Sequence, residues 1–176
     1  MRSLRLIGAG VLLLAAVFVL TSLLGAGSGV AAVVIWVLWF VVAGANGWLG
    51  VRKGGYGIAE EAPVFLLVFG VPAAVACVLW WAGVPTIHTG RTWWVLLGGV
   101  LLWGGITLLA TLQLVTRRTA LITFIVVWIA WCAVNAVRGV VSAGYSVGEE
   151  AGVFVLNAAV PIAVALIVAK VSARWS

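Results

Sequence analysis

Residues 46–65 read NGWLGVRKGGYGIAEEAPVF, and residues 135–154 read NAVRGVVSAGYSVGEEAGVF. A shift of 89 positions superposes the two stretches without a gap, and 16 of the 31 positions over residues 46–76 carry the same amino acid in both. The same register continues upstream, where Trp39 falls on Trp128. The chain therefore contains two copies of one unit, and its fold has to accommodate both.

The composition excludes a soluble domain. Apolar residues make up 65% of the 176 residues, charged residues make up 8%, and the mean hydropathy is +1.30. In soluble domains about a quarter of the residues are charged. Six apolar runs are each long enough to cross about 30 Å of hydrocarbon as a helix. They cover residues 6–24, 30–49, 63–83, 94–114, 119–137 and 151–171.

Each copy of the duplication contains three of these runs. The first copy covers residues 1–87 and the second covers residues 90–176, within a single membrane domain of residues 1–176. Because three is an odd number, the second copy enters the bilayer from the opposite side. We therefore predict an all-α integral membrane protein with six transmembrane helices in two inverted-topology three-helix repeats (3+3). Such repeats are typical of alternating-access transporters.

The placement of Lys and Arg predicts the orientation, because cytoplasmic connections carry an excess of these residues. With a cytoplasmic N-terminus, the outer segments carry only Arg91 and Arg138 of the ten basic residues. The inner segments carry Arg2, Arg5, Arg52, Lys53, Arg117, Arg118, Lys170 and Arg174. We therefore expect a protein of the prokaryotic cytoplasmic membrane with both termini in the cytoplasm.

Small residues predict a close contact between the first and fourth runs. Gly98, Gly99, Gly104 and Gly105 lie in the fourth run, and their equivalents in the first are Ala9, Gly10, Ala15 and Ala16. Small side chains let helix backbones approach closely in a membrane. The alternative is that Gly and Ala are simply common in such helices.

The four acidic residues of the chain are the adjacent pairs Glu60–Glu61 and Glu149–Glu150, at the start of the third and sixth helices. One interpretation is structural, because negative charge is favoured at a helix N-terminus. The functional interpretation places a carboxylate at each mouth of a pathway, where it gathers a cation or relays a proton. One helical step of about 100° separates the two members of a pair, so they face different ways. The sequence does not tell which member faces inward.

Tyrosine and asparagine accompany the glutamates in both copies. Tyr56 and Tyr145 are the only tyrosines; each either donates a hydrogen bond to the second glutamate or anchors the chain at the interface. Asn46 and Asn135 are expected to end the second and fifth helices, either as caps or as lining of a polar path.

Pro72 and Pro161 lie 11 residues beyond the second glutamates, which places them near the middle of the bilayer at about 1.5 Å per residue. A proline inside a helix frees a backbone carbonyl, which needs another partner in lipid. Two such positions related by inversion would meet at the midplane as hinges of a transport site. The alternative is a packing kink without a ligand.

Other chemistry is not indicated. His88 is the single histidine, so the sequence predicts no metal site, no cofactor and no catalytic set, and we expect a protein that is not an enzyme. The dispersed basic residues form no basic face and exclude nucleic acid as a partner.

The function that we expect from the sequence is a small multi-pass transporter or channel for a cation or small polar solute, with proton coupling through the paired glutamates as an option. Its partners would be the lipid bilayer and a small solute or ion, and a homo-oligomer is possible. The alternatives are a non-catalytic structural or accessory membrane subunit and a lipid-handling protein. Architecture alone does not decide among these functions.

Overall fold

The computed structural model describes residues 2–83 and 91–172, so His88 lies outside the described residues. The described part is all-helical, and its six helices are long and apolar enough to cross a membrane. They are α1 (Arg2–Leu23), α2 (Ser28–Gly54), α3 (Ile58–Ala82), α4 (Arg91–Thr111), α5 (Arg117–Ala143) and α6 (Val147–Ser172). These helices agree with the six apolar runs.

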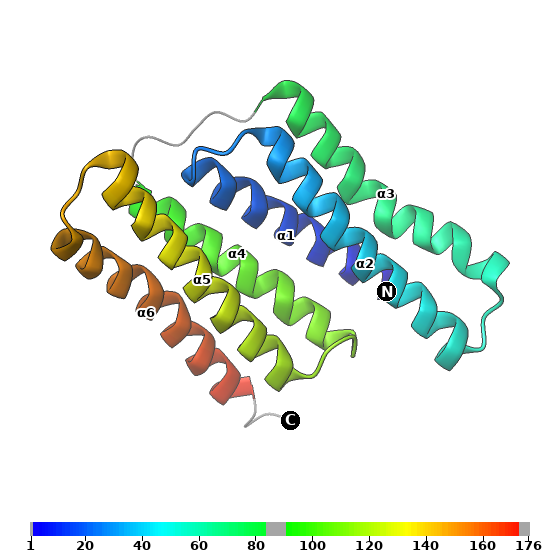
Figure 1. The fold of residues 1–176 in the computed structure, drawn as a ribbon. Coiled ribbons are helices and arrows are strands. Elements are labelled where there is room, and N and C mark those ends of the chain that lie inside the picture. Colours follow the sequence, from blue (N-terminus) through cyan, green and yellow to red (C-terminus); the bar gives the residue numbers. More distant parts are fainter. Residues whose placement is uncertain (1, 84–90, 173–176) are drawn as a thin grey trace.

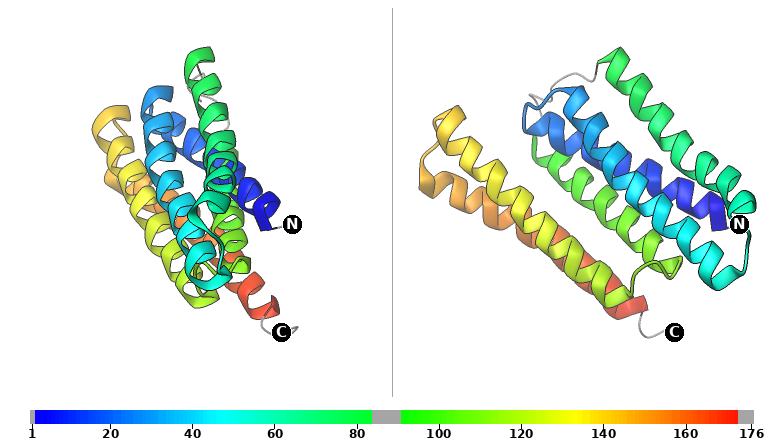
Figure 2. Two further views of the ribbon diagram at one scale, coloured as in Figure 1. Left: turned by 90° about the vertical axis from the view of Figure 1, so that its right-hand side faces the viewer. Right: turned by 45° about the vertical axis from the view of Figure 1, so that its right-hand side comes forward.

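Consecutive helices run in opposite directions along the molecule (Figure 1). Helices α1 and α4 lie side by side in the centre, with the α2–α3 hairpin on one side and the α5–α6 hairpin on the other (Figure 2). Each hairpin packs against the central helix of its own copy, so the α1–α4 pair joins the two copies.

The α1–α4 contact is the most extensive in the molecule, as the small residues predict. A Cβ atom on Gly105 would lie 2.6 Å from Cγ of Leu13 and 3.4 Å from the backbone oxygen of Ala9. A Cβ atom on Gly98 would lie 2.6 Å from Cδ2 of Leu20. Glycine therefore lets leucine side chains of α1 pack directly against the backbone of α4.

The second and fifth helices are longer than expected. Helix α2 continues past Asn46 to Gly54, and α5 continues past Asn135 to Ala143. The prediction that the asparagines end these helices was wrong, because both side chains are buried against neighbouring helices and the chain keeps its helical path.

Glycine, not asparagine, ends both helices. Gly55 has φ 71° and Gly144 has φ 76°, in the left-handed region that favours glycine. The N–H of Gly55 bonds to the carbonyl of Gly50, and that of Gly144 bonds to the carbonyl of Gly139. Residues 55–57 and 144–146 are all that remains between the helices, so the glutamates fall in the first turn of α3 and α6.

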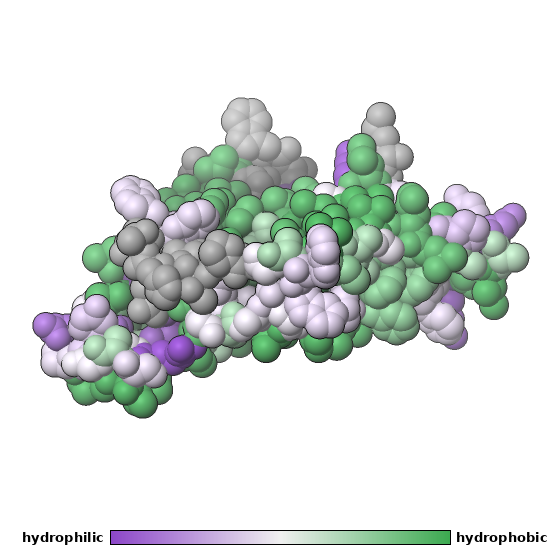
Figure 3. Space-filling model, turned by 90° about the horizontal axis from the view of Figure 1, so that it is seen from above, coloured by the Kyte–Doolittle hydropathy of each residue, from purple (hydrophilic) through white to green (hydrophobic). Residues whose placement is uncertain are grey.

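Tryptophan side chains divide into deep and peripheral groups. Trp39 is 1% exposed and Trp128 is fully buried, whereas Trp81 and Trp93 are largely exposed. Apolar side chains also cover much of the outer surface of α2, α3, α5 and α6. Hydrophilic residues gather toward the two ends of the face shown in Figure 3, and hydrophobic residues cover much of the length between them. This distribution is what a membrane-spanning bundle requires.

Candidate functional site

The second glutamate of each pair turns toward the preceding helix. The carboxyl group of Glu61 occupies the space where a side chain on Gly50 would begin, and Glu150 lies in the same way on Gly139. Each glycine therefore lets a carboxyl group lie directly against the backbone of α2 or α5. The two copies share this contact residue for residue.

The first glutamate of each pair caps its helix. The carboxylate of Glu60 accepts a hydrogen bond from the N–H of Gly57 at 2.8 Å. The carboxylate of Glu149 accepts hydrogen bonds from the N–H and the hydroxyl of Ser146 at 2.9 and 2.8 Å. The N–H of Glu149 donates in return to the Ser146 hydroxyl at 3.3 Å, which completes a capping box. Glu60 and Glu149 are exposed, so their geometry fits the structural interpretation.

Glu61 and Glu150 are the chemically unusual pair. Glu150 is only 7% exposed and Glu61 is partly buried. In each, one carboxyl oxygen, Oε2, is buried and has no hydrogen-bond partner among the described residues. Such an atom loses its solvation without compensation, unless water, a proton or a ligand supplies a partner. The structure thus separates the two members of each pair, which the sequence alone does not.

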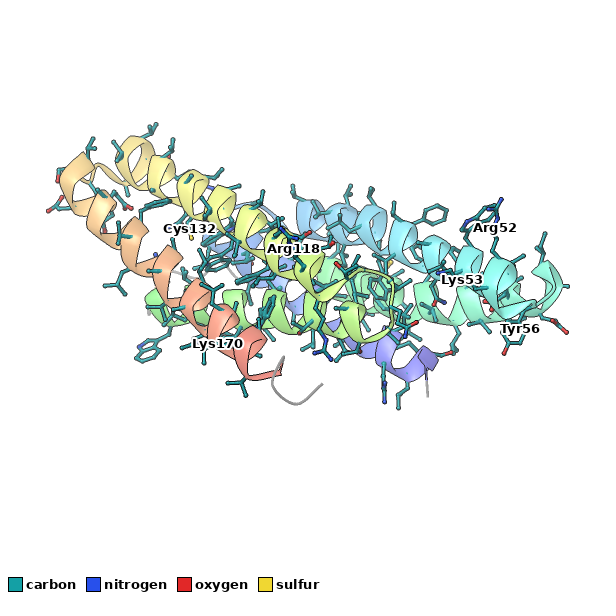
Figure 4. All side chains as sticks on the ribbon, turned by 90° about the horizontal axis from the view of Figure 1, so that it is seen from below. Arg52, Lys53, Tyr56, Arg118, Cys132 and Lys170 are labelled. Atoms are coloured by element: carbon teal, nitrogen blue, oxygen red, sulfur yellow. The ribbon has the colours of Figure 1, made fainter. Side chains whose placement is uncertain are left out.

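The two carboxyl groups lie at opposite ends of the molecule. The α2–α3 connection is at one end and the α5–α6 connection at the other (Figure 1). Tyr56 marks the first end, close to Arg52 and Lys53 (Figure 4). The guanidinium of Arg52 lies 4.7 Å from the ring centroid of Trp48, which is a cation–π geometry.

A cavity of about 330 Å³ opens beside Glu150, between α4, α5 and α6. It is lined by Val95, Asn135, Tyr145, Glu149, Glu150, Val153 and Asn157. Asn135 is 4% exposed and Asn157 is also 4% exposed, so two buried amides and one buried carboxyl group meet in it. Four of the residues predicted from the sequence, Asn135, Tyr145, Glu149 and Glu150, are thereby brought together.

The first copy differs at this place. Val68 stands where the second copy has Asn157, and Leu6 stands where it has Val95. Both first-copy residues are fully buried apolar side chains. Asn46, the mate of Asn135, is buried with its side-chain oxygen unpartnered among the described residues. The polar character of the site is therefore greater in the second copy.

Each hairpin also carries an apolar groove beside its buried glutamate. The groove at Glu61 has a volume of about 490 Å³, and the groove at Glu150 has a volume of about 360 Å³. Equivalent residues line both, among them Phe65 in the first copy and Phe154 in the second. Glu150 borders both its groove and the polar cavity.

Pro72 and Pro161 each free a backbone carbonyl that has a defined hydrogen-bond partner. Pro72 cannot donate to the carbonyl of Val68, four residues earlier, and the indole N–H of Trp39 bonds to that carbonyl at 2.8 Å. In the second copy, the indole N–H of Trp128 bonds to the carbonyl of Asn157 at 3.0 Å, four residues before Pro161. Each freed carbonyl therefore accepts a hydrogen bond from a tryptophan of the neighbouring helix.

The central helices approach these prolines through glycine. A Cβ atom on Gly10 of α1 would lie 2.7 Å from Cγ of Pro72 and 2.7 Å from the Trp39 ring. A Cβ atom on Gly99 of α4 would lie 3.0 Å from the Trp128 ring and 3.2 Å from Cβ of Pro161. Glycine, tryptophan and proline thus form one contact in each copy, which joins all three of its helices.

The tyrosines favour the anchoring interpretation. Tyr56 is 55% exposed and Tyr145 is 52% exposed. Neither donates a hydrogen bond to a glutamate within residues 2–83 and 91–172. The ring of Tyr56 instead packs against Gly54, where a Cβ atom would lie 2.7 Å from it.

Sequence reasoning missed Asn157, assigned no role to Gly50 or Gly139, and did not predict the hydrogen bonds that Trp39 and Trp128 donate. The sequence did contain a signal for Asn157, because it is a lone polar residue within an apolar run and aligns with Val68 of the first copy. Gly50 and Trp39 are identical to their equivalents in the second copy. Which residues they contact depends on how each helix is rotated about its own axis.

No known protein family, curated protein or solved structure matches the chain.

Proposed function

We propose that this protein is a small transporter or channel for a cation or small polar solute, with Glu61 and Glu150 as the charged groups of its pathway. The observation that carries the proposal is that Glu61 and Glu150 each have one buried carboxyl oxygen without a partner among the described residues. Ionisable residues within membrane helices are costly, and a solute pathway is a common reason for their presence. A purely structural acid would instead resemble Glu60 and Glu149, which are exposed and capped.

We further propose that the two copies are inverted-topology repeats, with both termini in the cytoplasm of a prokaryotic cell. The ungapped duplication, the odd number of helices per copy and the eight-to-two bias of basic residues support this topology. The opposite directions of α1 and α4 agree with it. Glu61 would then serve the cytoplasmic mouth, and Glu150 would serve the outer mouth.

The α1–α4 pair would act as the fixed element in such a transporter, because glycine contacts hold it together closely. Each hairpin would rock against this pair about its contact of glycine, tryptophan and proline, with Pro72 and Pro161 as the hinges near the midplane. Rigid-body movement of this kind is how inverted-repeat transporters expose one side at a time.

The test is cation uptake by the purified chain in proteoliposomes, with protein-free vesicles as the control. A panel of labelled monovalent cations, driven by a membrane potential, should accumulate only in vesicles that contain the protein. Absence of uptake for every cation, together with co-purification of a larger membrane complex, would favour an accessory subunit instead.

A further inference from the structure

The cavity beside Glu150 has the features of a binding site for one chemical class. We propose that it binds a small protonated primary amine, and that the equivalent place in the first copy does not. This inference rests on the proposed function, because it names the solute class that the pathway would accept.

The charge of the cavity matches a monovalent cation. Two carboxylates line it, but Glu149 is engaged by the N–H and hydroxyl of Ser146 at the start of α6. Glu150 alone offers a buried oxygen without a partner among the described residues. One buried negative charge is best neutralised by one positive charge, because a second uncompensated charge would be costly in this setting.

The shape and the other polar groups favour an ammonium group over a bare metal ion. A primary ammonium has three N–H donors. Glu150, Asn157 and Tyr145 line the cavity, and their carboxyl, amide and hydroxyl groups can accept hydrogen bonds. A volume of about 330 Å³ leaves space beyond the charged group, and Val95 and Val153 form apolar wall beside it. An alkyl chain of a few carbons would fill this space and bury its surface.

The difference between the copies points to the second copy as the binding half. Asn157 is a buried amide, and the residues beside it in α6 are apolar. The first copy has Val68 at the equivalent position, so a valine is sufficient there for packing alone. A buried polar side chain costs stability relative to valine unless it gains a partner. In the proposed complex, the ligand bonds to the Asn157 amide.

The experiment measures binding to the purified full-length chain in detergent, by isothermal titration calorimetry and by thermal unfolding. The probes are butylammonium chloride, tetramethylammonium chloride and sodium chloride at equal ionic strength. Butylammonium should bind saturably and raise the Tm, because it binds only the folded state. Tetramethylammonium, which has the charge but no N–H donor, should bind about tenfold more weakly. Equal binding of the two organic cations would overturn the assignment, and so would no saturable binding of butylammonium.

Three variants locate the site. Glu150→Gln should weaken butylammonium binding about tenfold or more, since it removes the charge-assisted hydrogen bond. Asn157→Val should weaken binding while raising the Tm of the ligand-free protein, and this raised Tm shows that the variant is folded. Glu60→Gln removes a capping carboxylate from the first copy and should leave binding unchanged. Equal losses in Glu60→Gln and Glu150→Gln would contradict the proposed site.

Failure of this inference differs from failure of the proposed transport. If the protein carries sodium or rubidium into vesicles but does not bind butylammonium, the amine assignment is wrong and the transport proposal stands. If butylammonium binds through Glu150 but no cation crosses the membrane, the binding site stands and the transport proposal is wrong.

Discussion

Glu61 and Glu150 each lie on a glycine of the neighbouring helix, and this contact distinguishes them from the glutamates directly before them. Gly50 and Gly139 have no side chain that would hold the carboxyl group away from the backbone. The inward position of the acid therefore depends on two residues, one on each helix of the hairpin. A change in the glycine should disturb the acid without removing its charge.

Gly50→Ala and Gly139→Ala are predicted to displace the carboxyl groups of Glu61 and Glu150. Each added methyl group would overlap a carboxyl group, so the flexible glutamate side chain must turn away. We therefore expect these variants to lose much of the gain of up to about 1 kcal/mol that alanine brings to a helix in place of glycine. Cation flux should fall as well, although both carboxylates remain. Unfolding in a denaturing detergent and uptake by proteoliposomes measure the two effects.

Gly44→Ala is the matched control, because a Cβ atom there meets nothing within 4 Å. It should leave flux unchanged and stabilise α2 by up to about 1 kcal/mol through helix propensity. If Gly44→Ala and Gly50→Ala have the same effect, the glycine–glutamate contact has no special role.

The choice between adjacent glutamates shows where sequence reasoning ends at the scale of single residues. The helix start and the one-step rotation between Glu60 and Glu61 are predictable from the sequence. Which of them faces α2 depends on the rotation of α3 about its own axis, and this is set by packing against α1 and α2. The identity of Gly50 and Gly139 in the two copies was the available signal, and it becomes informative only once these helices are known to extend past the asparagines.

At the scale of helices, Pro72 and Pro161 are each paired with a tryptophan from the neighbouring helix. The indole N–H of Trp39 bonds to the carbonyl that Pro72 frees, and Trp128 does the same for Pro161. This interaction lets α3 and α6 contain a proline without an unpaired carbonyl in the membrane interior. The tryptophan and the proline should therefore be energetically coupled.

A double-mutant cycle on Trp39→Phe and Pro72→Ala tests this coupling. Trp39→Phe alone should cost about 1–3 kcal/mol of stability, because it leaves the carbonyl of Val68 without a donor. In the Pro72→Ala background, the backbone N–H of residue 72 can bond to that carbonyl, so the same change should cost less. Equilibrium unfolding of the four proteins gives the coupling free energy, and strictly additive losses would contradict the pairing.

The helices themselves were largely predictable, and their ends were less so. The six apolar runs follow from composition and spacing, and they agree with the six helices. The ends of α2 and α5 do not, because Asn46 is polar and resembles a terminus although its side chain is buried between helices. Polarity marks a helix end only where the side chain reaches water.

At the scale of the whole molecule, two copies of a three-helix unit meet through their first helices. Their buried glutamates lie at opposite ends, next to the connections 55–57 and 144–146. If the repeats are inverted in the membrane, these connections are exposed on opposite sides of it. The location of each connection is therefore a direct readout of the topology.

Tyr56→Cys and Tyr145→Cys report these locations in a background that lacks Cys77 and Cys132. Tyr56 and Tyr145 are more than half exposed, so the new thiols should be accessible. We expect a membrane-impermeant maleimide to label Tyr145→Cys in intact cells and Tyr56→Cys only after permeabilisation. Labelling of both positions from the same side would exclude an odd number of spans between them and with it the inverted repeat.

The central claim is that the inward glutamates carry the pathway and the capping glutamates do not. Its most direct test is potential-driven cation uptake by proteoliposomes containing Glu61→Gln, Glu150→Gln, Glu60→Gln or Glu149→Gln, at equal amounts of folded protein. We predict that Glu61→Gln and Glu150→Gln abolish uptake. Glu60→Gln and Glu149→Gln should retain most of the uptake, because they remove only a cap at the start of a helix. Wild-type uptake in all four variants, or equal losses in all four, would contradict the account.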